Sequence, residues 1–475
     1  MSSDSDIRDL VVVGGGAAGI VAAKTAVKLG ASAVLIESAR TGGDCLWTGC
    51  VPSKSLLAAA HHVAAARRAT SLGVHFDEPV VDFAAVMRHV RSAISTIEPI
   101  DTPEALETEG IEVRSGHAVF ATDDTVLVEG DPIRFRQAVI ATGASPVLPP
   151  IPGLADHAPL TSETIWELTE LPQRLLVIGG GSIGCELGQA LARLGSTTTI
   201  VEAAPRILMG EPEDASRIVA RSLKNDGATV IAGASVESIA DSRARLSDGT
   251  VVDFDRVLVS VGRAARTAGL GLDQIGVRTN DRGQVIVSPT LRTTNPRIWA
   301  AGDVTPLPQF THAAGSFGSI AASNAVLGLR RKAGTTVVPR VTYTDPEVAS
   351  VGVSDPDSAS RLTARTISHD HLDRAITEHS TNGFSRLILD HKARIIGGTV
   401  VSPRAGETIG EVTLAVRLGL RARDLASTMH PYPTYNDGIW NAAIADTREQ
   451  LESPGAQRAM GALSSLRRTW LRIAR

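Results

Sequence analysis

The segment Asp9-Leu-Val-Val-Val-Gly-Gly-Gly-Ala-Ala-Gly19 predicts a dinucleotide-binding fold at the start of the chain. Its apolar run, Asp9–Val13, is typical of a buried strand in a parallel sheet, and an alanine-rich helix is predicted to follow as far as about Leu29. A second strand, Ala33–Ile36, ends at Glu37. This order of strand, glycines, helix, strand and terminal acid predicts dinucleotide binding, with a purely structural turn as the alternative.

Each spaced glycine of this segment has a mechanical role in such a fold. Gly14 permits the tight turn, Gly16 lets the backbone approach a pyrophosphate, and Gly19 lets the helix pack closely on the strand. The helix N-terminus adds N–H groups and positive potential. Glu37 lies 18 positions after Gly19, where a carboxylate can bind a ribose 2′-hydroxyl.

The same pattern recurs later in the chain and predicts a second dinucleotide site. It consists of the strand Leu175–Ile178, the glycines Gly179, Gly181 and Gly184, a helix to about Leu194, the strand Thr198–Val201, and Glu202. Two such sites are typical of a flavoprotein that passes electrons between NAD(P)H and FAD. The carboxylate of Glu202 favours NAD(H) and repels the 2′-phosphate of NADP(H), although nearby Arg206 weakens this preference. We therefore expect NADH as the electron donor.

A pair of cysteines follows the first predicted fold, in Gly42-Gly-Asp-Cys45-Leu-Trp-Thr-Gly-Cys50-Val-Pro-Ser-Lys54. The two sulfurs come within reach of a disulfide if the residues between them form one helical turn. The start of a helix also lowers thiol pKa values, because its dipole favours thiolate. The alternatives are a zinc half-site, which needs two further ligands, or two buried structural thiols. A redox function is favoured, and Cys185 is expected to be a packing residue.

The bulk composition excludes several classes of function. A formal net charge of -4 and an aromatic content of 3% give no basis for nucleic-acid binding. Residues 1–10 lack the features of a signal peptide, and no apolar run reaches the length of a membrane span. Three cysteines in 475 residues are not a secreted disulfide framework. We expect a cytoplasmic enzyme without a resident metal.

With these motifs the sequence resembles the class I pyridine nucleotide–disulfide oxidoreductases, the family of dihydrolipoamide dehydrogenase, glutathione reductase and mercuric reductase. The segment Gly42–Lys54 is similar to the redox motif of that family. Ala141-Thr-Gly143-Ala144 resembles the return of the chain to the FAD domain, and Asn295–Asp303 resembles the second FAD motif. Tyr343–Gly352 resembles the start of the dimerisation domain.

The resemblance implies an α/β fold with two Rossmann-like dinucleotide-binding domains, for FAD and NAD, and a C-terminal α+β dimerisation domain. The FAD domain would comprise residues 1–155 and 282–335, with the NAD(P) domain 156–281 inserted between them. The interface domain would comprise residues 336–475. A homodimer is implied by the resemblance alone.

The family mechanism assigns roles to individual residues. NADH would reduce FAD, and FAD would reduce a Cys45–Cys50 disulfide. Cys50 would be the flavin-side thiol, and Cys45 the interchange thiol that meets the substrate. Lys54 and Glu186 match the lysine–glutamate pair beside the flavin. The cofactor-binding residues expected from motif and resemblance are Gly14, Gly16, Gly19, Glu37, Gly43, Ala141, Thr142, Gly143, Gly302 and Asp303 for FAD, and Gly179, Gly181, Gly184, Glu202 and Gly262 for the nicotinamide cofactor.

The C-terminal region departs from the disulfide-reducing members of the family. They carry His-x-His-Pro-Thr-x-x-Glu, whereas this chain has His430-Pro-Tyr-Pro-Thr-Tyr-Asn-Asp437. Tyr432 replaces the histidine base and Asp437 replaces the glutamate that orients it. The phenol of a tyrosine has a pKa of about 10, so it is a poor proton shuttle at neutral pH. It can still donate a hydrogen bond or help to hold a metal. Strand-like spacing would displace His430 from the base position by about 7 Å, so it is not assumed to replace the base.

These departures leave the electron acceptor open. The expected function is an FAD-dependent oxidoreductase whose acceptor, a metal ion, quinone or small disulfide, needs no histidine base. Dihydrolipoamide dehydrogenase is one alternative. A mercuric-reductase-like metal reductase is another, although the chain lacks a C-terminal cysteine pair. Ser182, where glutathione reductase has a gating tyrosine, is expected to leave the nicotinamide site open. A redox-linked binding protein is disfavoured by the intact cysteine pair.

The basic segment Leu466–Arg475 carries Trp470 and four arginines. A short basic helix binds lipid weakly, so we expect a solvated terminal helix or frayed tail instead of a membrane-surface contact.

Overall fold

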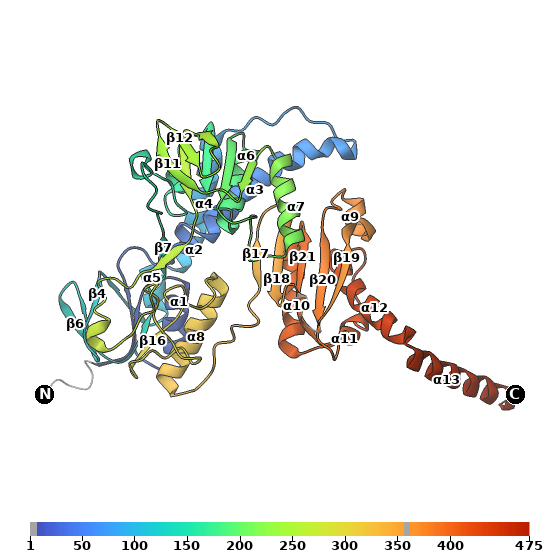
Figure 1. Ribbon diagram of the computed structural model, residues 1–475. Coiled ribbons are helices and arrows are strands. Elements are labelled where there is room, and N and C mark those ends of the chain that lie inside the picture. Colours follow the sequence, from blue (N-terminus) through green and yellow to red (C-terminus); the bar gives the residue numbers. More distant parts are fainter. Residues whose placement is uncertain (1–6, 356–361, 475) are drawn as a thin grey trace. The chain divides into compact units, whose positions relative to one another are not determined.

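A computed structural model describes residues 7–355 and 362–474 (Figure 1). The chain divides into two compact units. Unit 1 contains Met1–Leu208 and Leu223–Thr335, and unit 2 contains Met209–Ser222 and Thr336–Arg475. Met209–Ser222 therefore groups with the C-terminal residues, although its sequence position lies within the expected NAD(P) domain. Among the described helices, none is long and apolar enough to cross a membrane.

The first sheet of unit 1 has the order β3-β2-β1-β6-β5-β4, and β16 pairs with β6. Its strands are β1 (Ile7–Val13), β2 (Ala33–Glu37), β3 (Ile111–Ser115), β4 (Ala118–Thr122), β5 (Thr125–Val128), β6 (Asp131–Ile140) and β16 (Ile298–Ala300). The pairs around β1, β2, β3, β6 and β16 are parallel, whereas β4–β5 and β5–β6 are antiparallel. Residues Leu10–Val13 are buried, as expected of a parallel strand covered on both faces.

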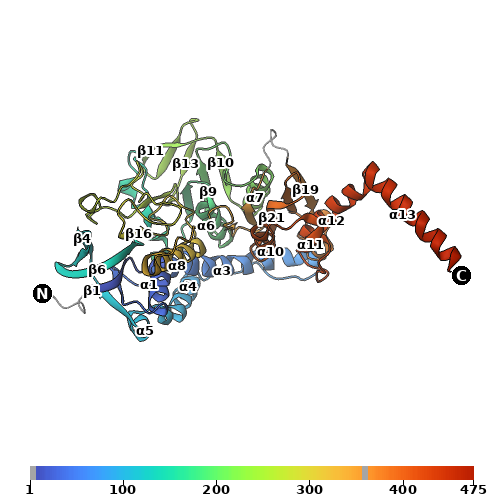
Figure 2. The same ribbon diagram turned by 90° about the horizontal axis from the view of Figure 1, so that it is seen from below.

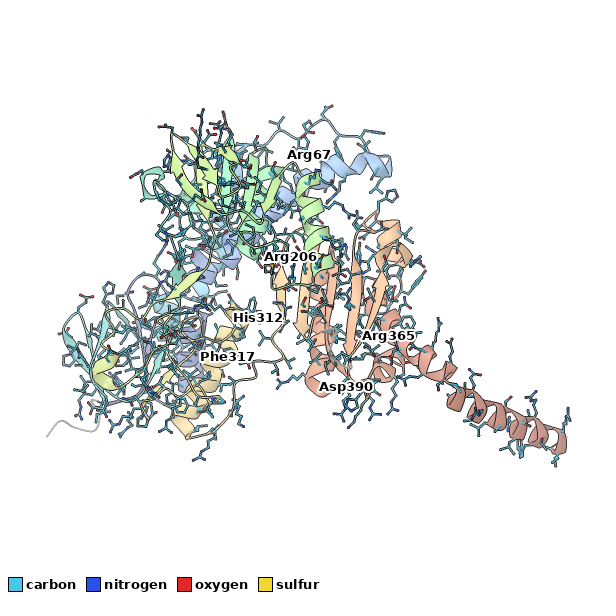
Figure 3. The ribbon with its side chains drawn as sticks, in the orientation of Figure 1. Arg67, Arg206, His312, Phe317, Arg365 and Asp390 are labelled. Atoms are coloured by element: carbon cyan, nitrogen blue, oxygen red, sulfur yellow. The ribbon has the colours of Figure 1, made fainter. Side chains whose placement is uncertain are left out.

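Some helices of unit 1 contact this sheet, and others carry the cysteine motif. They are α1 (Ala17–Lys28), α2 (Gly43–Trp47), α3 (Cys50–Arg68), α4 (Phe83–Ile97), α5 (Pro103–Thr108) and α8 (Thr311–Leu327). Helices α1 and α8 lie side by side (Figures 1 and 2). A side chain at Gly318 of α8 would meet the carbonyl oxygen of Ala18 at 2.1 Å, so the two helices pack backbone against backbone. Phe317 and His312 also belong to α8 (Figure 3).

Unit 1 also contains smaller sheets, one of which carries the second glycine motif. The parallel sheet β10-β9-β8-β14 is flanked by α6 (Ser182–Arg193). Its strands are β8 (Arg174–Ile178), β9 (Thr197–Glu202), β10 (Thr229–Ala232) and β14 (Arg256–Val259). An antiparallel sheet contains β11 (Val236–Ala240), β12 (Arg243–Leu246) and β13 (Val251–Asp253), and a two-stranded sheet pairs β7 (Ala144–Pro146) with β15 (Arg263–Ala265).

Unit 2 is built on an antiparallel five-stranded sheet in the order β17-β18-β21-β20-β19 (Figure 1). Its strands are β17 (Arg340–Thr342), β18 (Glu347–Gly352), β19 (Thr363–Ser368), β20 (Phe384–Leu389) and β21 (Ile395–Ser402). Helix α7 (Glu213–Asn225) begins in this unit. The other helices are α9 (Asp373–Thr377), α10 (Ala405–Leu418), α11 (Ala422–Ala426), α12 (Asp437–Glu452) and α13 (Pro454–Ile473). Arg365 on β19 pairs with Asp446 and Glu449 on α12 (Figure 3).

The expected fold class is confirmed: two mainly parallel, helix-flanked sheets and a C-terminal α+β unit. The strand–glycine–helix–strand order is present at both motifs. The main differences lie at the boundaries, since β1 begins at Ile7 and β8 at Arg174, just before the apolar runs.

Candidate active site

The first glycine loop forms a turn that only glycine fits. Gly14 has a φ of 108°, and a Cβ there would meet the carbonyl oxygen of Ala141 at 2.4 Å. A Cβ at Gly19 would meet the carbonyl oxygen of Gly14 at 1.8 Å, so helix and strand approach as the motif predicts. Gly16 caps α1, and a Cβ built there would have only the Gly43 Cα, at 3.8 Å, as a neighbour. The backbone at Gly16 is therefore open towards a ligand.

A cavity of about 810 Å³ opens beside this loop in unit 1. Its lining includes most of the residues expected to bind FAD, together with one cysteine: Gly14, Gly16, Glu37, Gly43, Cys45, Ala141, Thr142, Gly143, Gly302 and Asp303. The volume suits a large cofactor. Burial raises the pKa of Asp303 above its ordinary value, and Arg263 opposes this effect. Loop, volume and polar lining together fit FAD.

Glu37 is held in place by the backbone at the edge of the cavity. Its Oε2 accepts a hydrogen bond from the Gly15 N–H at 2.6 Å, and its Oε1 accepts one from the Ala39 N–H at 2.7 Å. Each carboxylate oxygen keeps a further lone pair for a ligand hydroxyl. The arrangement fits the expected contact with a ribose.

The second glycine loop repeats this geometry. Glu202 Oε2 accepts from the Gly180 N–H at 2.6 Å, and Oε1 accepts from the Ala204 N–H at 2.7 Å. A Cβ at Gly184 would meet the carbonyl oxygen of Gly179 at 2.0 Å, which matches Gly19 in the first loop. No atom lies within 4 Å of a Cβ built at Gly181 in the described structure.

Two further residues near the second loop bear on the nicotinamide cofactor. Gly262 has a φ of 134° and follows β14, at the same edge of the sheet as Gly179. Arg206 Nη1 donates to the carbonyl oxygen of Leu208 at 2.8 Å (Figure 3). The Arg206 guanidinium is thus engaged with the main chain. This contact opposes the expected effect of Arg206, which was to weaken the preference of Glu202 for NAD(H).

The cysteine pair occupies a break between two helices. Cys45 lies in α2, and Cys50 is the first residue of α3. Gly49 makes the break possible, because a Cβ there would meet the carbonyl oxygen of Asp44 at 2.7 Å. Both cysteines are free thiols; Cys45 is half-buried and Cys50 is exposed. They hydrogen-bond to one another, so the short break brings the sulfurs together as the spacing allows.

The two thiols are electrostatically different. The hydrogen bond from Cys45, with smaller effects of Thr311 and Lys54, lowers the pKa of Cys50 to about 6 against the opposing effect of burial. The same hydrogen bond, together with burial, raises the pKa of Cys45. The reduced pair therefore holds a Cys50 thiolate and a protonated Cys45 at neutral pH. Among the described residues, Cys45 lines the cavity and Cys50 does not, but Cys50 contacts Thr311, which does.

The lysine and glutamate expected beside the flavin form an ion pair near these thiols. Lys54 Nζ lies 2.8 Å from Glu186 Oε2, with Lys54 on α3 and Glu186 buried on α6. The charge of Lys54 lowers the pKa of Cys50, and that of Glu186 raises it. The pair thus links the helix of the second glycine loop to the helix that begins at Cys50.

A group of charged residues around the cysteine loop was not expected from the sequence. Asp44, directly before Cys45, is paired with Arg263 and with Arg266, whose Nη1 lies 3.5 Å from Asp44 Oδ1. Arg266 Nη2 also lies 2.6 Å from Glu163. For two of these residues the sequence contained a signal. Asp44 lies inside the redox motif, and Arg263 is next to Gly262. Arg266 and Glu163 are distant in sequence, and both line the cavity in the folded chain.

Thr311 is a further site residue that no sequence signal indicated. It is the first residue of α8, and its Oγ1 lies 3.3 Å from Cys50 Sγ. Its hydroxyl also lowers the pKa of Cys45. Thr311 therefore contacts both sulfurs and is suited to stabilise thiolate.

Replacing Thr311 by valine is expected to raise the pKa of Cys50 above about 6. The change keeps the shape of the side chain and removes a hydrogen bond that favours the anion. Thiolate predominates above the pKa, so the variant will hold less thiolate between pH 6 and 7, as measured by titrating thiolate absorbance in the reduced protein. Thr48→Val is a matched control, because Thr48 lines the same cavity and bonds to Asp44. An unchanged Cys50 titration in Thr311→Val would contradict the assigned role.

In unit 2, the C-terminal motif has contacts that differ from the family pattern. Tyr432 is 70% exposed, and its hydroxyl donates to Asp373, not to Asp437. The hydrogen bond to Asp373, with the charges of Asp373 and Asp437, raises the pKa of Tyr432. Asp437 is buried at the start of α12, and its Oδ2 accepts from the Thr434 N–H at 2.9 Å. Tyr432 therefore stays protonated at neutral pH.

His430 is committed to other contacts and does not offer a free nitrogen. Its side chain is 5% exposed and stacks on Trp440. Nε2 lies 2.6 Å from Glu411 Oε1, and Nδ1 lies 2.9 Å from the carbonyl oxygen of Thr428. Both ring nitrogens therefore face oxygen atoms that accept hydrogen bonds. His430 thus holds the segment together instead of replacing the missing base.

Known proteins match both parts of the chain. The family model of pyridine nucleotide-disulphide oxidoreductases matches residues 8–318, and the model of their dimerisation domain matches residues 338–443. A mercuric reductase from Bacillus cereus is 34% identical over 453 residues, covering 92% of this chain and 71% of the relative. A dihydrolipoyl dehydrogenase from Geobacillus stearothermophilus is 34% identical over 454 residues, covering 92% and 95%.

A solved structure shares the whole fold. The Cu(II) complex of the HOCl-induced flavoprotein disulfide reductase RclA from Escherichia coli matches with a TM-score of 0.83 and 27% identity, covering 92% of this chain and 99% of that one. The two glycine loops, the cavity and the cysteine pair described above are consistent with the family that these matches indicate. The chain belongs to the pyridine nucleotide-disulphide oxidoreductase family and is an NAD(P)H-dependent flavoprotein disulfide oxidoreductase.

Proposed function

We propose that this enzyme reduces a soft metal ion, such as Hg(II) or Cu(II), at the Cys45–Cys50 pair with NADH as the electron donor. The observation that carries the proposal is the asymmetric thiol pair. With a pKa of about 6, Cys50 is about nine-tenths thiolate at pH 7. Thiolates are the preferred ligands of soft metal ions, and no substrate proton has to be removed before binding.

Each residue of this site has a distinct role in the proposed reaction. Cys50 provides the resident thiolate, and Cys45 provides a second sulfur whose proton leaves when the metal binds. Lys54 and Glu186 place opposite charges next to Cys50, and the Thr311 hydroxyl lies within hydrogen-bond distance of Cys50 Sγ. Bound FAD supplies the two-electron connection between the nicotinamide and the cysteine pair. The overall reaction balances as NADH plus Hg(II) giving NAD⁺, H⁺ and Hg(0), or with two Cu(II) giving two Cu(I).

The C-terminal motif argues against a disulfide substrate. Reduction of a disulfide substrate depends on an acid–base group that delivers protons to the product thiols, and Tyr432 is held protonated by Asp373. His430 is engaged by Glu411 and the main chain. Mercuric reductases are among the relatives of this chain, and RclA has been solved with Cu(II). Both relationships support a metal ion as acceptor over lipoamide.

A comparison of acceptors tests this function. NADH oxidation by the FAD-loaded protein is expected to be faster with Hg(II) or Cu(II), in the presence of a thiol, than with lipoamide, glutathione disulfide or a quinone. Tyr432→His is expected to increase lipoamide turnover by at least about tenfold, because a base contributes roughly 10²–10⁴-fold. The variant is not expected to accelerate metal reduction. Lipoamide turnover by the unaltered enzyme that exceeds metal turnover would disprove the proposal.

The second glycine loop supports NADH over NADPH. The Glu202 carboxylate is fixed by two backbone N–H groups, and Arg206 donates to the main chain. A fixed carboxylate repels a 2′-phosphate. We expect kcat/KM to be at least about tenfold higher for NADH than for NADPH, which corresponds to about 1.4 kcal/mol.

Glu202→Gln is expected to move this NADH/NADPH ratio towards one, as steady-state kinetics with both cofactors will show. Glu37→Gln is the matched control, since Glu37 has the same backbone contacts in the first loop. The control is expected to affect FAD affinity and to leave the ratio unchanged. An NADPH preference in the unaltered enzyme would contradict the assignment.

The remaining expectations for the chain are part of the same proposal. We propose FAD-domain segments 1–155 and 282–335, an NAD(P) domain 156–281 and an interface domain 336–475. The dimerisation-domain match at residues 338–443 supports a homodimer. In such a dimer, Tyr432 and Asp437 would belong to the acceptor site, with Tyr432 as a hydrogen-bond donor.

A further inference from the structure

Helix α13 presents an exposed apolar stripe. The helix runs from Pro454 to Ile473, and none of the side chains in this described range is buried. The stripe is formed by large apolar residues spaced three or four apart, which a helix places on one face. Its members are Met460, Leu463, Leu466, Trp470 and Ile473, with exposures of 37% to 79%. Exposed apolar surface of this extent marks an interaction site.

The charges of α13 are all positive. Residues 454–474 contain four arginines and no aspartate or glutamate, in a chain whose formal net charge is -4. At 3.6 residues per turn, Arg458, Arg468 and Arg472 fall on the side opposite the stripe. Arg467 borders the stripe, and its guanidinium lies 4.3 Å from the centre of the Trp470 ring. The helix is therefore amphipathic and basic.

The start of α13 is specified by local sequence. Ser453 caps the helix by accepting from the Ala456 N–H at 3.4 Å, and Pro454 occupies the first turn. Both features favour a defined helix start. Gln457 Nε2 also donates to the carbonyl oxygen of Leu451 at 3.0 Å, which ties α13 to the end of α12. Leu466–Ile473 therefore belongs to a 20-residue helix.

We propose that α13 lies flat on an anionic lipid surface. The stripe would enter the boundary between headgroups and acyl chains, Trp470 would sit at headgroup level, and the arginines would meet lipid phosphates. This combination of aromatic, leucine and arginine residues is typical of interfacial helices. Pairing with α13 of a second copy is disfavoured, because helix pairs use opposite charges beside the seam and α13 has only arginines.

Co-sedimentation of the full, FAD-loaded protein with vesicles tests this attachment. The unaltered protein is expected to bind vesicles of phosphatidylcholine mixed with phosphatidylglycerol, and to bind pure phosphatidylcholine weakly. Each arginine near an anionic surface contributes roughly a fivefold factor, so Arg468→Gln with Arg472→Gln is expected to lower the partition coefficient about 25-fold. Glutamine preserves helix propensity. FAD content and NADH oxidation are expected to be unchanged in this variant.

Two control variants distinguish lipid binding by α13 from general charge attraction and from self-association. Arg278→Gln with Arg282→Gln removes the same charge from exposed positions of unit 1 and is expected to leave binding unchanged. Leu466→Ser with Trp470→Ser is expected to weaken vesicle binding without changing the lipid-free mass measured by light scattering. A lower mass in that variant would show that a second copy covers the stripe and would overturn the proposal. Equal weakening by both arginine pairs, or no binding to phosphatidylglycerol, would also overturn it.

Discussion

Cys50→Ser is expected to lower NADH-dependent metal-ion reduction by about 10³-fold or more, because it removes the only group of the pair that is thiolate at neutral pH. The variant keeps Lys54, Glu186 and Thr311, which contact or surround the position. It is expected to bind FAD normally. Loss of activity would therefore report the missing sulfur and not a damaged cofactor site.

Cys45→Ser is the companion variant and is expected to behave differently. It retains the Cys50 thiolate and can retain a hydroxyl donor to it, so the long-wavelength absorbance of a thiolate against oxidised flavin is expected without added reductant. Its appearance with pH will report a Cys50 pKa near the value of about 6. In Cys50→Ser the band is expected to be absent. Metal reduction at an unaltered rate in both variants would show that the cysteines do not serve the acceptor.

Gly16→Ala is expected to weaken FAD binding by roughly 10–100-fold without destabilising the apoprotein. The protein itself has room for the methyl group, since the nearest atom to a Cβ is the Gly43 Cα at 3.8 Å. The methyl group would separate the backbone from a pyrophosphate and weaken a hydrogen bond to a charged group, which costs about 1.5–3 kcal/mol. FAD affinity from fluorescence titration and Tm of the apoprotein measure the two effects separately.

Gly181→Ala provides the matched control in the second loop. Gly181 caps α6 as Gly16 caps α1, and no described atom lies within 4 Å of its Cβ position. This variant is expected to raise KM for NADH and to retain full FAD content. Gly19→Ala, whose Cβ would collide with the Gly14 carbonyl, is expected to lower the Tm of the apoprotein. If Gly16→Ala and Gly181→Ala affect the same cofactor, the assignment of one loop to each dinucleotide is wrong.

Local sequence was sufficient for the two nucleotide folds and the cysteine pair. Strand, glycine turn and helix are short-range features, so spacing alone indicated β1, α1 and the turn at Gly14, and equally β8, α6 and Gly179. The Cys45–Cys50 contact is also local, since it depends on the five-residue step across Gly49. The residues expected to bind FAD line the cavity of unit 1, apart from Gly19, which packs the helix on the strand.

Other contacts of the cysteine loop come from distant parts of the chain. Thr311 reaches Cys50 from a helix 261 residues away, and Arg266 reaches Asp44 across 222 residues. In unit 2, Tyr432 bonds to Asp373, and His430 bonds to Glu411. No spacing rule relates such positions, because their contacts follow from how separate elements pack. The amino-acid sequence was therefore enough to predict the two glycine loops and the close pair of sulfurs, whose mutual effect on their pKa values is local. Thr311 and Arg266 reach the cysteine loop only because folding brings distant elements together.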